Sequence, residues 1–347
     1  MIPPVERGGI RAFFLYDVAD TIDLSAIPRV LGADVARAPL QLRPEAASSF
    51  IQFDIPPVIV PRTALEVGAD GMQVKIFDYG VVSVSLHFPF AGAWSAFVES
   101  ARRMRRDESL ASLARRELEA VLAELQPCLD DPHEPLVEDY FVFEVERFAA
   151  PVASAALIAA DAGELARLVV GEERSLSPKE QDDVFRVSFS YYEDDLAILG
   201  WDNAFVYDAN PAPVVDILEF ANTQLVELRT YDGRLDAELD RIYTAKGERS
   251  AEPMRYLIVD IRELLDRSTN ALKFIGDAYY ARLYRGAATR LGLEDWQRQI
   301  DAKLRSVNEM YRFAQDRAEH RRDTVLELII ILLIVVEVVI GFLTLRH

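Results

Sequence analysis

The sequence has little of what disulfides, metal sites and nucleic-acid interfaces require. Its single cysteine, Cys128, rules out a disulfide framework and a cysteine-based metal site within the chain. Its four histidines, at positions 87, 133, 320 and 347, do not lie at metal-ligand spacing from one another. The formal net charge of −19 argues against electrostatic binding of nucleic acid, whose phosphates require patches of lysine and arginine. We therefore expect no cofactor and no direct contact with nucleic acid.

Motifs of common enzyme classes are also missing from the sequence. Gly8 and Gly9 precede a predicted strand instead of following one, so they do not form a phosphate-binding loop, and no Gly-x-Ser-x-Gly elbow is present. The first residues lack the basic segment and apolar run of a secretory signal. We expect a protein that is not an enzyme and whose body stays on the side of the membrane where it is made.

What the sequence does have is a long apolar run, Val325 to Leu345, near its end. As a helix this run is about 31 Å long, which matches the hydrocarbon thickness of a bilayer. We predict one transmembrane helix over 325–345. The alternative is a buried core or oligomer-interface helix, because Glu327 and Glu337 are unfavourable in lipid.

The charges that flank this run predict an orientation. Arg317, Arg321 and Arg322 precede it, whereas only Arg346 and His347 follow it. The positive-inside rule then places the N-terminal body in the cytoplasm. The prediction is a single-pass protein of the cytoplasmic membrane, or of the mitochondrial inner membrane if the source is eukaryotic.

Residues 1–210 read as a mixed α/β body. An acidic, proline-rich stretch at 126–135 predicts a linker and a possible boundary within this body. Four arginines, Arg102, Arg103, Arg105 and Arg106, are expected on the solvent side of a helix. The predicted strands are 11–18, 50–60, 72–78, 81–88, 136–148 and three between 185 and 207, and the predicted helices are 23–31, one bent helix or a pair over 92–125, 153–170 and 177–184.

Residues 211–324 predict a helical stalk. Apolar residues recur at steps of three and four over 214–242, over 254–282 and from Leu293 onward. The pattern leaves open whether these seams close within one chain or between subunits. The predicted fold class is α+β: a mixed α/β N-terminal body followed by long antiparallel or coiled-coil helices and one C-terminal transmembrane helix.

Three segments of the chain resemble a known family. They are residues 77–82 (FDYGVV), 189–208 (FSYYEDDLAILGWDNAFVYD) and 321–338 (RRDTVLELIIILLIVVEV). Together they are similar to the proteins named for "required for meiotic nuclear division", also called domain of unknown function 155, over about residues 11–342. The resemblance implies a membrane protein with a C-terminal span. The family's mitochondrial members form large homo-oligomers and support translation at the inner membrane.

Two groups of acidic residues are candidate sites. Glu193, Asp194, Asp195 and Asp202 lie in predicted hairpin turns and are weak candidate ligands for Mg²⁺ or Ca²⁺. The alternative is two solvated turns, because Asp and Asn suit turns without a ligand. Glu337, and with it Glu327, is a candidate contact between identical helices inside the bilayer.

Two functional hypotheses follow from these patterns. The first is a membrane-anchored scaffold that self-associates through its stalk and transmembrane helix and holds an unknown protein partner. The second is a divalent-metal-dependent enzyme or binding module at the cytoplasmic face of the membrane.

Overall fold

The computed structural model describes residues 2–31, 36–37, 56–62, 68–244, 261, 277–307, 309, 327, 329–331, 333 and 334. The chain divides into two compact units. The first contains residues 1–231 and 260–297, and the second contains residues 232–259 and 298–347. Each unit is described by itself.

In the described residues, the first unit is built on a nine-stranded sheet with the strand order β2-β3-β4-β5-β1-β6-β9-β8-β7. All neighbouring strands are antiparallel except β6 and β9, which are parallel. The strands are β1 (Val5–Ile22), β2 (Ala36–Arg37), β3 (Val58–Arg62), β4 (Gly71–Ile76), β5 (Val81–Gly92), β6 (Leu129–Phe148), β7 (Ser188–Phe189), β8 (Leu196–Leu199) and β9 (Asn203–Tyr207).

Alternation along the strands gives the sheet two different faces. In β5, Val82, Val84 and Leu86 point to one face and join the main apolar core, whereas Ser83 and Ser85 point to the other. The turn between β4 and β5 contains Gly80 at φ +87. The first face is therefore apolar, and the second carries buried polar groups.

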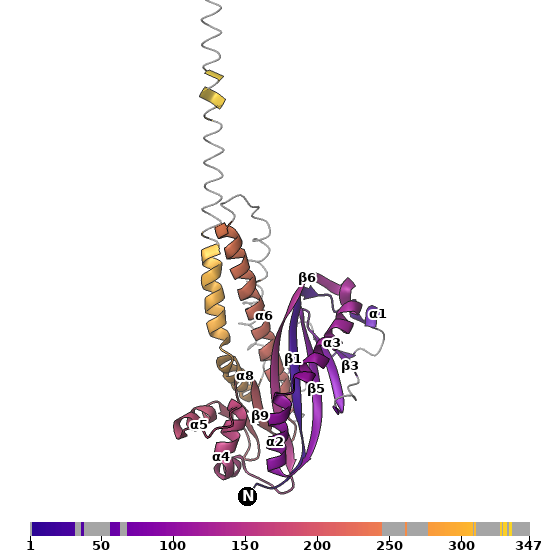
Figure 1. Cartoon of the computed structure of the whole chain (residues 1–347), viewed down its shortest axis with the longest axis vertical. Coiled ribbons are helices and arrows are strands. Elements are labelled where there is room, and N and C mark those ends of the chain that lie inside the picture. The colour runs from indigo at the N-terminus through magenta and orange to yellow at the C-terminus, as the bar shows by residue number, and fades with distance from the viewer. Residues whose placement is uncertain are drawn as a thin grey trace, which may run out of the picture. The chain divides into compact units, whose positions relative to one another are not determined.

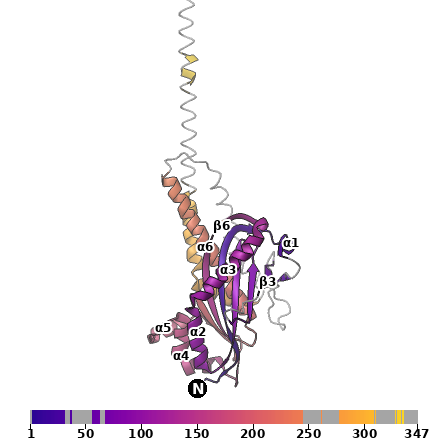
Figure 2. The same ribbon diagram turned by 45° about the vertical axis from the view of Figure 1, so that its right-hand side comes forward.

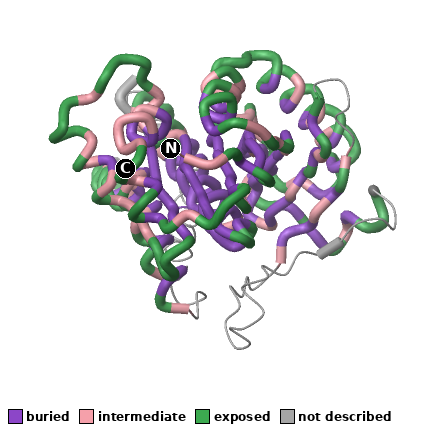
Figure 3. The backbone as a smooth tube through the Cα atoms, turned by 90° about the horizontal axis from the view of Figure 1, so that it is seen from below, coloured by how far each residue is buried: buried purple, intermediate pink, exposed green. Residues whose placement is uncertain are grey.

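Helices cover both faces of the sheet (Figures 1 and 2). Helices α2 to α5 pack on the apolar face, and α6 and α8 pack on the polar face. Figure 3 shows the strands buried and the outer turns of the helices exposed. The helices are α1 (Ile27–Leu31), α2 (Trp94–Arg105), α3 (Glu108–Leu125), α4 (Ser154–Val170), α5 (Pro178–Phe185), α6 (Ala212–Thr244) and α8 (Ala278–Arg290), and residues 293–307 are also helical.

The mixed α/β body is confirmed, with one correction. Residues 129–135 are not a linker but the first part of β6, and Pro132 lies opposite Ala19 of β1. Prolines are tolerated here because β9 pairs only with Phe141–Val145, so this part of β6 has one unpaired edge in the described part of the chain. The predicted helix pair is confirmed as α2 and α3, which are separated at Arg106–Asp107.

The long helix after residue 211 is confirmed as α6, but the coiled-coil interpretation is wrong. The seam residues Val214, Leu218, Leu225 and Leu228 are buried, as expected, yet so are Thr223 and Glu227 between them. The first half of α6 lies on the sheet and is buried on several sides, whereas a coiled-coil helix buries only a narrow seam. The predicted helix over 254–282 lies mostly outside the described residues, and α8 begins only after Asp277.

The second unit contains the described end of the chain. Lys303 lies 2.7 Å from Asp232 and 2.6 Å from Asp236. Five apolar residues further along are helical, and each is between 48% and 62% exposed: Ile329, Ile330, Ile331, Leu333 and Ile334.

The prediction of a transmembrane helix over 325–345 is not supported. Among the described residues, none of the helices has the length and apolar character needed to cross a membrane. The predicted single-pass placement in a cytoplasmic or mitochondrial membrane is corrected with it.

The residues predicted to serve that span lie mostly beyond what the structure describes. Glu327 is helical and exposed. Glu337 and the flanking arginines Arg317, Arg321 and Arg322 lie outside the described residues, so their predicted roles have no structural counterpart here.

Candidate functional site

Three arginines gather on one face at the end of α2. Arg102, Arg105 and Arg106 are three and four positions apart, which places their side chains on one side of the helix. The helix stops there because Asp107 begins α3, its carboxylate accepting a hydrogen bond from the Ser109 amide at 3.0 Å. The arginines therefore project together from the last turn of α2.

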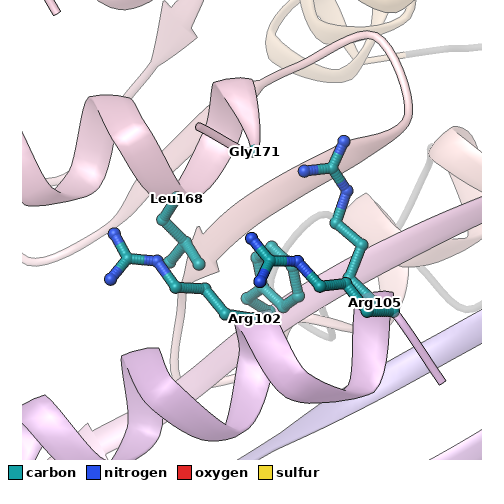
Figure 4. Close-up of a pocket in the computed structure, with 6 residues that line it drawn as sticks. Arg102, Arg105, Leu168 and Gly171 are labelled. Atoms are coloured by element: carbon teal, nitrogen blue, oxygen red, sulfur yellow. The ribbon is translucent and has the colours of Figure 1, made fainter. Parts of the chain in front are cut away.

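A small pocket of about 10 Å³ lies beside these arginines (Figure 4). Its other lining residues are Phe143 of β6 and Leu168 and Gly171 at the end of α4. Gly171 has φ +78 and ends α4 in the left-handed conformation. A Cβ atom at this position would lie 1.2 Å from Nη1 of Arg105, so only glycine allows the guanidinium to lie against this turn.

Each pocket arginine is held by a carboxylate from another element. Nη2 of Arg102 lies 2.6 Å from Oε1 of Glu164 in α4, and Nη1 of Arg106 lies 2.5 Å from Oε1 of Glu173. These residues come from the helix that faces α2 and from the loop after it. The contacts fix the positions of these guanidinium groups.

Arg105 pairs with Asp202 in the turn between β8 and β9. The pocket is lined by the end of α2, β6 and the end of α4, and Asp202 lies beside it as the partner of Arg105. Each of the three ion pairs engages one guanidinium nitrogen, whereas a guanidinium offers five N–H donors. In the described part of the chain, donors therefore remain for an anionic ligand, and the ring of Phe143 supplies an apolar wall.

The predicted acidic cluster is divided between two places. The carboxylate of Asp195 is buried and accepts hydrogen bonds from the amides of Tyr191 (2.6 Å) and Tyr192 (3.0 Å), so it stabilises the turn before β8. The carbonyl oxygen of Glu193 accepts from the amide of Ser154. Asp202 lies at the other end of β8, beside Arg105.

No metal site is evident in the part of the chain that the structure describes. There, no group of three or more His, Cys, Asp or Glu side chains is arranged to hold a metal ion. Among the described residues, Asp194 belongs to no such group. The candidate metal ligands therefore remain a prediction.

A second charged cluster lies between the polar face of the sheet and α6. Nζ of Lys75 donates to Oδ1 of Asp216 at 3.0 Å and also to Glu219. Beside them, Nε of Arg11 lies 2.8 Å from Oε1 of Glu144. Burial alone would lower the pKa of Lys75, but the charges of Glu219 and Asp216 raise it above its ordinary value.

Lys75 lies opposite Ser83 on the neighbouring strand, a placement that suggests a lysine–serine pair. A lysine can activate a serine only when it loses its proton near neutral pH. The carboxylates of Asp216 and Glu219 keep Lys75 as an ammonium ion, so this cluster holds α6 on the sheet and does not form a nucleophile–base pair.

The arginine pocket was missed at the sequence level. The four arginines stood out as a cluster but were assigned to the solvent side of a helix. Arg103 is indeed exposed, whereas Arg102 and Arg105 are partly buried against α4. Arg102 and Arg105 are three positions apart, so the sequence places both on one face of the helix. The sequence does not show that α4 covers this face.

Comparison with known proteins concerns the N-terminal part of the chain. The family described as "Uncharacterized protein MJ0711, N-terminal domain" matches residues 7–212. The chain is 22% identical over 187 residues to the "Uncharacterized protein MJ0711" of Methanocaldococcus jannaschii, an alignment that covers 51% of this chain. The chain spans 58% of that relative's length. No solved structure matches the chain.

These findings correct the resemblance to the proteins required for meiotic nuclear division. The matching family is a different one, and neither the family match nor the archaeal relative points to domain of unknown function 155. The segments that suggested the resemblance include the end of the chain, which lies outside residues 7–212. All six residues that line the arginine pocket lie within the matched region.

Proposed function

The chain belongs to the family of the MJ0711 N-terminal domain, and we propose that its matched region is a binding module whose arginine pocket holds an anionic group. The ligand is a phosphate or carboxylate carried by a larger molecule. In this role the protein is an interaction or scaffold protein that docks an acidic partner or a phosphorylated small molecule. The observation that carries the proposal is that three arginines line one small pocket in a chain of net charge −19.

The chemistry of guanidinium groups supports this proposal. The planar fork of arginine matches the oxygen geometry of carboxylates and phosphates, and charge-assisted hydrogen bonds of this kind are stronger than neutral ones. Arg102 and Arg105 are 28% and 23% exposed, so they are accessible yet anchored by Glu164 and Asp202. Anchoring lowers the entropy that a ligand must remove on binding.

The charges around the pocket are balanced. The side chains of Arg102, Arg105, Arg106 and Arg167 face Glu164, Asp202 and Glu173, and Asp139 lies near Arg105, which gives four cations and four carboxylates. A structural role accounts for part of this arrangement, because arginines stabilise the carbonyl ends of α2 and α4.

Titration with inorganic phosphate by isothermal calorimetry tests the proposal. We expect binding to the full chain with Kd below about 1 mM. The double substitution Arg102→Ala and Arg105→Ala removes two charged donors. Since a hydrogen bond to a charged group contributes about 1.5–3 kcal/mol, we expect binding to weaken at least 10-fold.

Arg103→Ala is the matched control, because it removes the same charge from an exposed position of the same helix outside the pocket. We expect its phosphate affinity to stay within about two-fold of the original chain. Arg105→Lys keeps the charge and loses the planar fork, so it should bind more weakly without loss of folding. Equal affinities in the pocket variant and in Arg103→Ala would overturn the proposal.

A further inference from the structure

We infer that the turn between β7 and β8, residues 190–195, is a docking surface for an arginine-bearing basic segment of a partner protein. None of these residues lines the arginine pocket. The inference therefore adds a second surface, of opposite charge, and does not depend on the proposed function.

Two aromatic side chains of this turn are exposed. Tyr191 and Tyr192 are 57% and 49% exposed. Their rings meet at 89° with centroids 4.8 Å apart, and the ring of Tyr191 also contacts that of Tyr279 in α8, with centroids 5.4 Å apart. Tyr279 is buried, so it holds the ring of Tyr191 in place. Exposed tyrosines in fixed positions are typical of protein interaction surfaces.

The backbone of the turn is fixed from beneath. The buried carboxylate of Asp195 accepts from two amides of the turn, and the carbonyl oxygen of Glu193 accepts from both the amide (2.7 Å) and the hydroxyl (3.1 Å) of Ser154 at the start of α4. The hydroxyl of Ser190 donates to the carbonyl oxygen of Tyr192 at 2.6 Å. A partner that binds here does not have to order the turn, which lowers the entropic cost of binding.

The charge of the turn determines the chemistry of the partner. Glu193 and Asp194 are exposed, and neither carboxylate has an ion-pair partner among the described residues. Arg282 is exposed one helical turn after Tyr279, yet it pairs with neither of them. Arginine suits such a surface, because a guanidinium group can stack on an aromatic ring and pair with a carboxylate at the same time. The turn thus offers rings and unpaired carboxylates to a basic segment.

Fluorescence anisotropy with a labelled heptapeptide of alternating glycine and arginine tests the inference. We expect the full chain to bind this peptide with Kd below about 1 mM at an ionic strength of about 50 mM. Tyr191→Ala with Tyr192→Ala leaves the net charge unchanged and should weaken binding at least about five-fold, since the stacking contacts are lost. Tyr191→Phe with Tyr192→Phe keeps both rings and should stay within about two-fold of the original chain.

A second pair of variants separates this turn from the general attraction of an acidic chain for a basic peptide. Glu193→Gln with Asp194→Asn removes both carboxylates and should weaken binding at least about three-fold. Glu99→Gln with Glu108→Gln is the control, because it removes two exposed carboxylates from α2 and α3 and should change binding by less than about two-fold.

Three results would overturn the inference: no binding by the original chain, a folded alanine variant that binds as tightly as the original, or a control that weakens binding as much as Glu193→Gln with Asp194→Asn. Circular dichroism shows whether each variant is folded. If the alanine variant unfolds, the comparison of the two carboxylate variants decides the outcome.

Discussion

Replacement of Lys75 by methionine tests whether the buried charges beneath α6 hold that helix on the sheet. The Lys75 side chain is 12% exposed, and its partners Glu219 and Asp216 are 3% and 28% exposed. Methionine is similar in length and keeps the apolar contacts of the lysine stem. The substitution therefore removes the ammonium ion and leaves Glu219 buried without its cation.

The structure sets the expected size of the effect. Removal of one partner from a buried ion pair costs about 3–5 kcal/mol, because the remaining charge stays buried. Asp216 is more exposed and can be solvated, so the cost comes mainly from Glu219. We expect the free energy of unfolding of Lys75→Met to fall by about 3 kcal/mol, at the lower end of that range.

Urea denaturation at pH 7, followed by circular dichroism, measures this change in the free energy of unfolding. The double variant Lys75→Met, Glu219→Leu removes both buried charges, and we expect it to recover at least half of the loss. Lys179→Met is the control, because Lys179 is exposed on α5 and its replacement should change stability by less than about 0.5 kcal/mol. A single variant as stable as Lys179→Met, or a double variant as unstable as Lys75→Met, would refute the reasoning.

Three further predictions concern other parts of the chain. Gly80→Ala should lower the free energy of unfolding by at least about 2 kcal/mol, because φ is +87 and the new Cβ would lie 1.7 Å from a backbone carbonyl oxygen. Gly68→Ala is the comparison: φ is +78 but nothing lies within 4 Å of the new Cβ, so the loss should be only about 1 kcal/mol. Urea denaturation measures both changes. Burial raises the pKa of Tyr16 to about 12, so the contribution of this residue to stability should be complete below pH 10 and decrease as the pH rises toward 12. Tyr16→Phe should reduce the loss of unfolding free energy over this pH range, and an unchanged loss would contradict the prediction. Self-association through the exposed apolar residues remains a prediction. Sedimentation should give a mass above the 39.1 kDa of one chain, and the double variant Ile330→Asp, Leu333→Asp should shift that mass toward 39.1 kDa. Binding of the original chain to lipid vesicles without self-association would count against this prediction.

Most elements of the first unit could be predicted from local patterns. The strand predicted at 81–88, a run rich in Val and aromatic residues, is part of β5. The helix predicted at 177–184 is α5, where the Ser177 hydroxyl accepts from the Glu180 amide at 3.2 Å. These signals depend on neighbours only a few residues apart. The interpretation failed at 129–135, because pairing with β1, more than 100 residues earlier, overrides the local signal of two prolines.

The candidate site could be predicted only in fragments. The sequence predicts Asp202 in an acidic turn and Arg105 in a group of four arginines. These two residues are 97 positions apart, and nothing in the sequence indicates that they pair. Glu173 could not be predicted as part of the site, because a single glutamate in an exposed loop belongs to no sequence motif. The acidic residues at 193–195 seemed to belong with Asp202, yet β8 separates the two turns.

By itself, the sequence determined the class of the body, its turns, the excess of negative charge and the presence of one arginine cluster in α2. These properties follow from composition and from periodicity within single elements. Only the tertiary structure decided that Arg102 and Arg105 lie against α4, that Gly171 leaves room for a guanidinium and that the polar face of the sheet is covered by α6. The physical reason is that each of these features is a contact between elements distant in sequence, and its geometry depends on the packing of the whole unit.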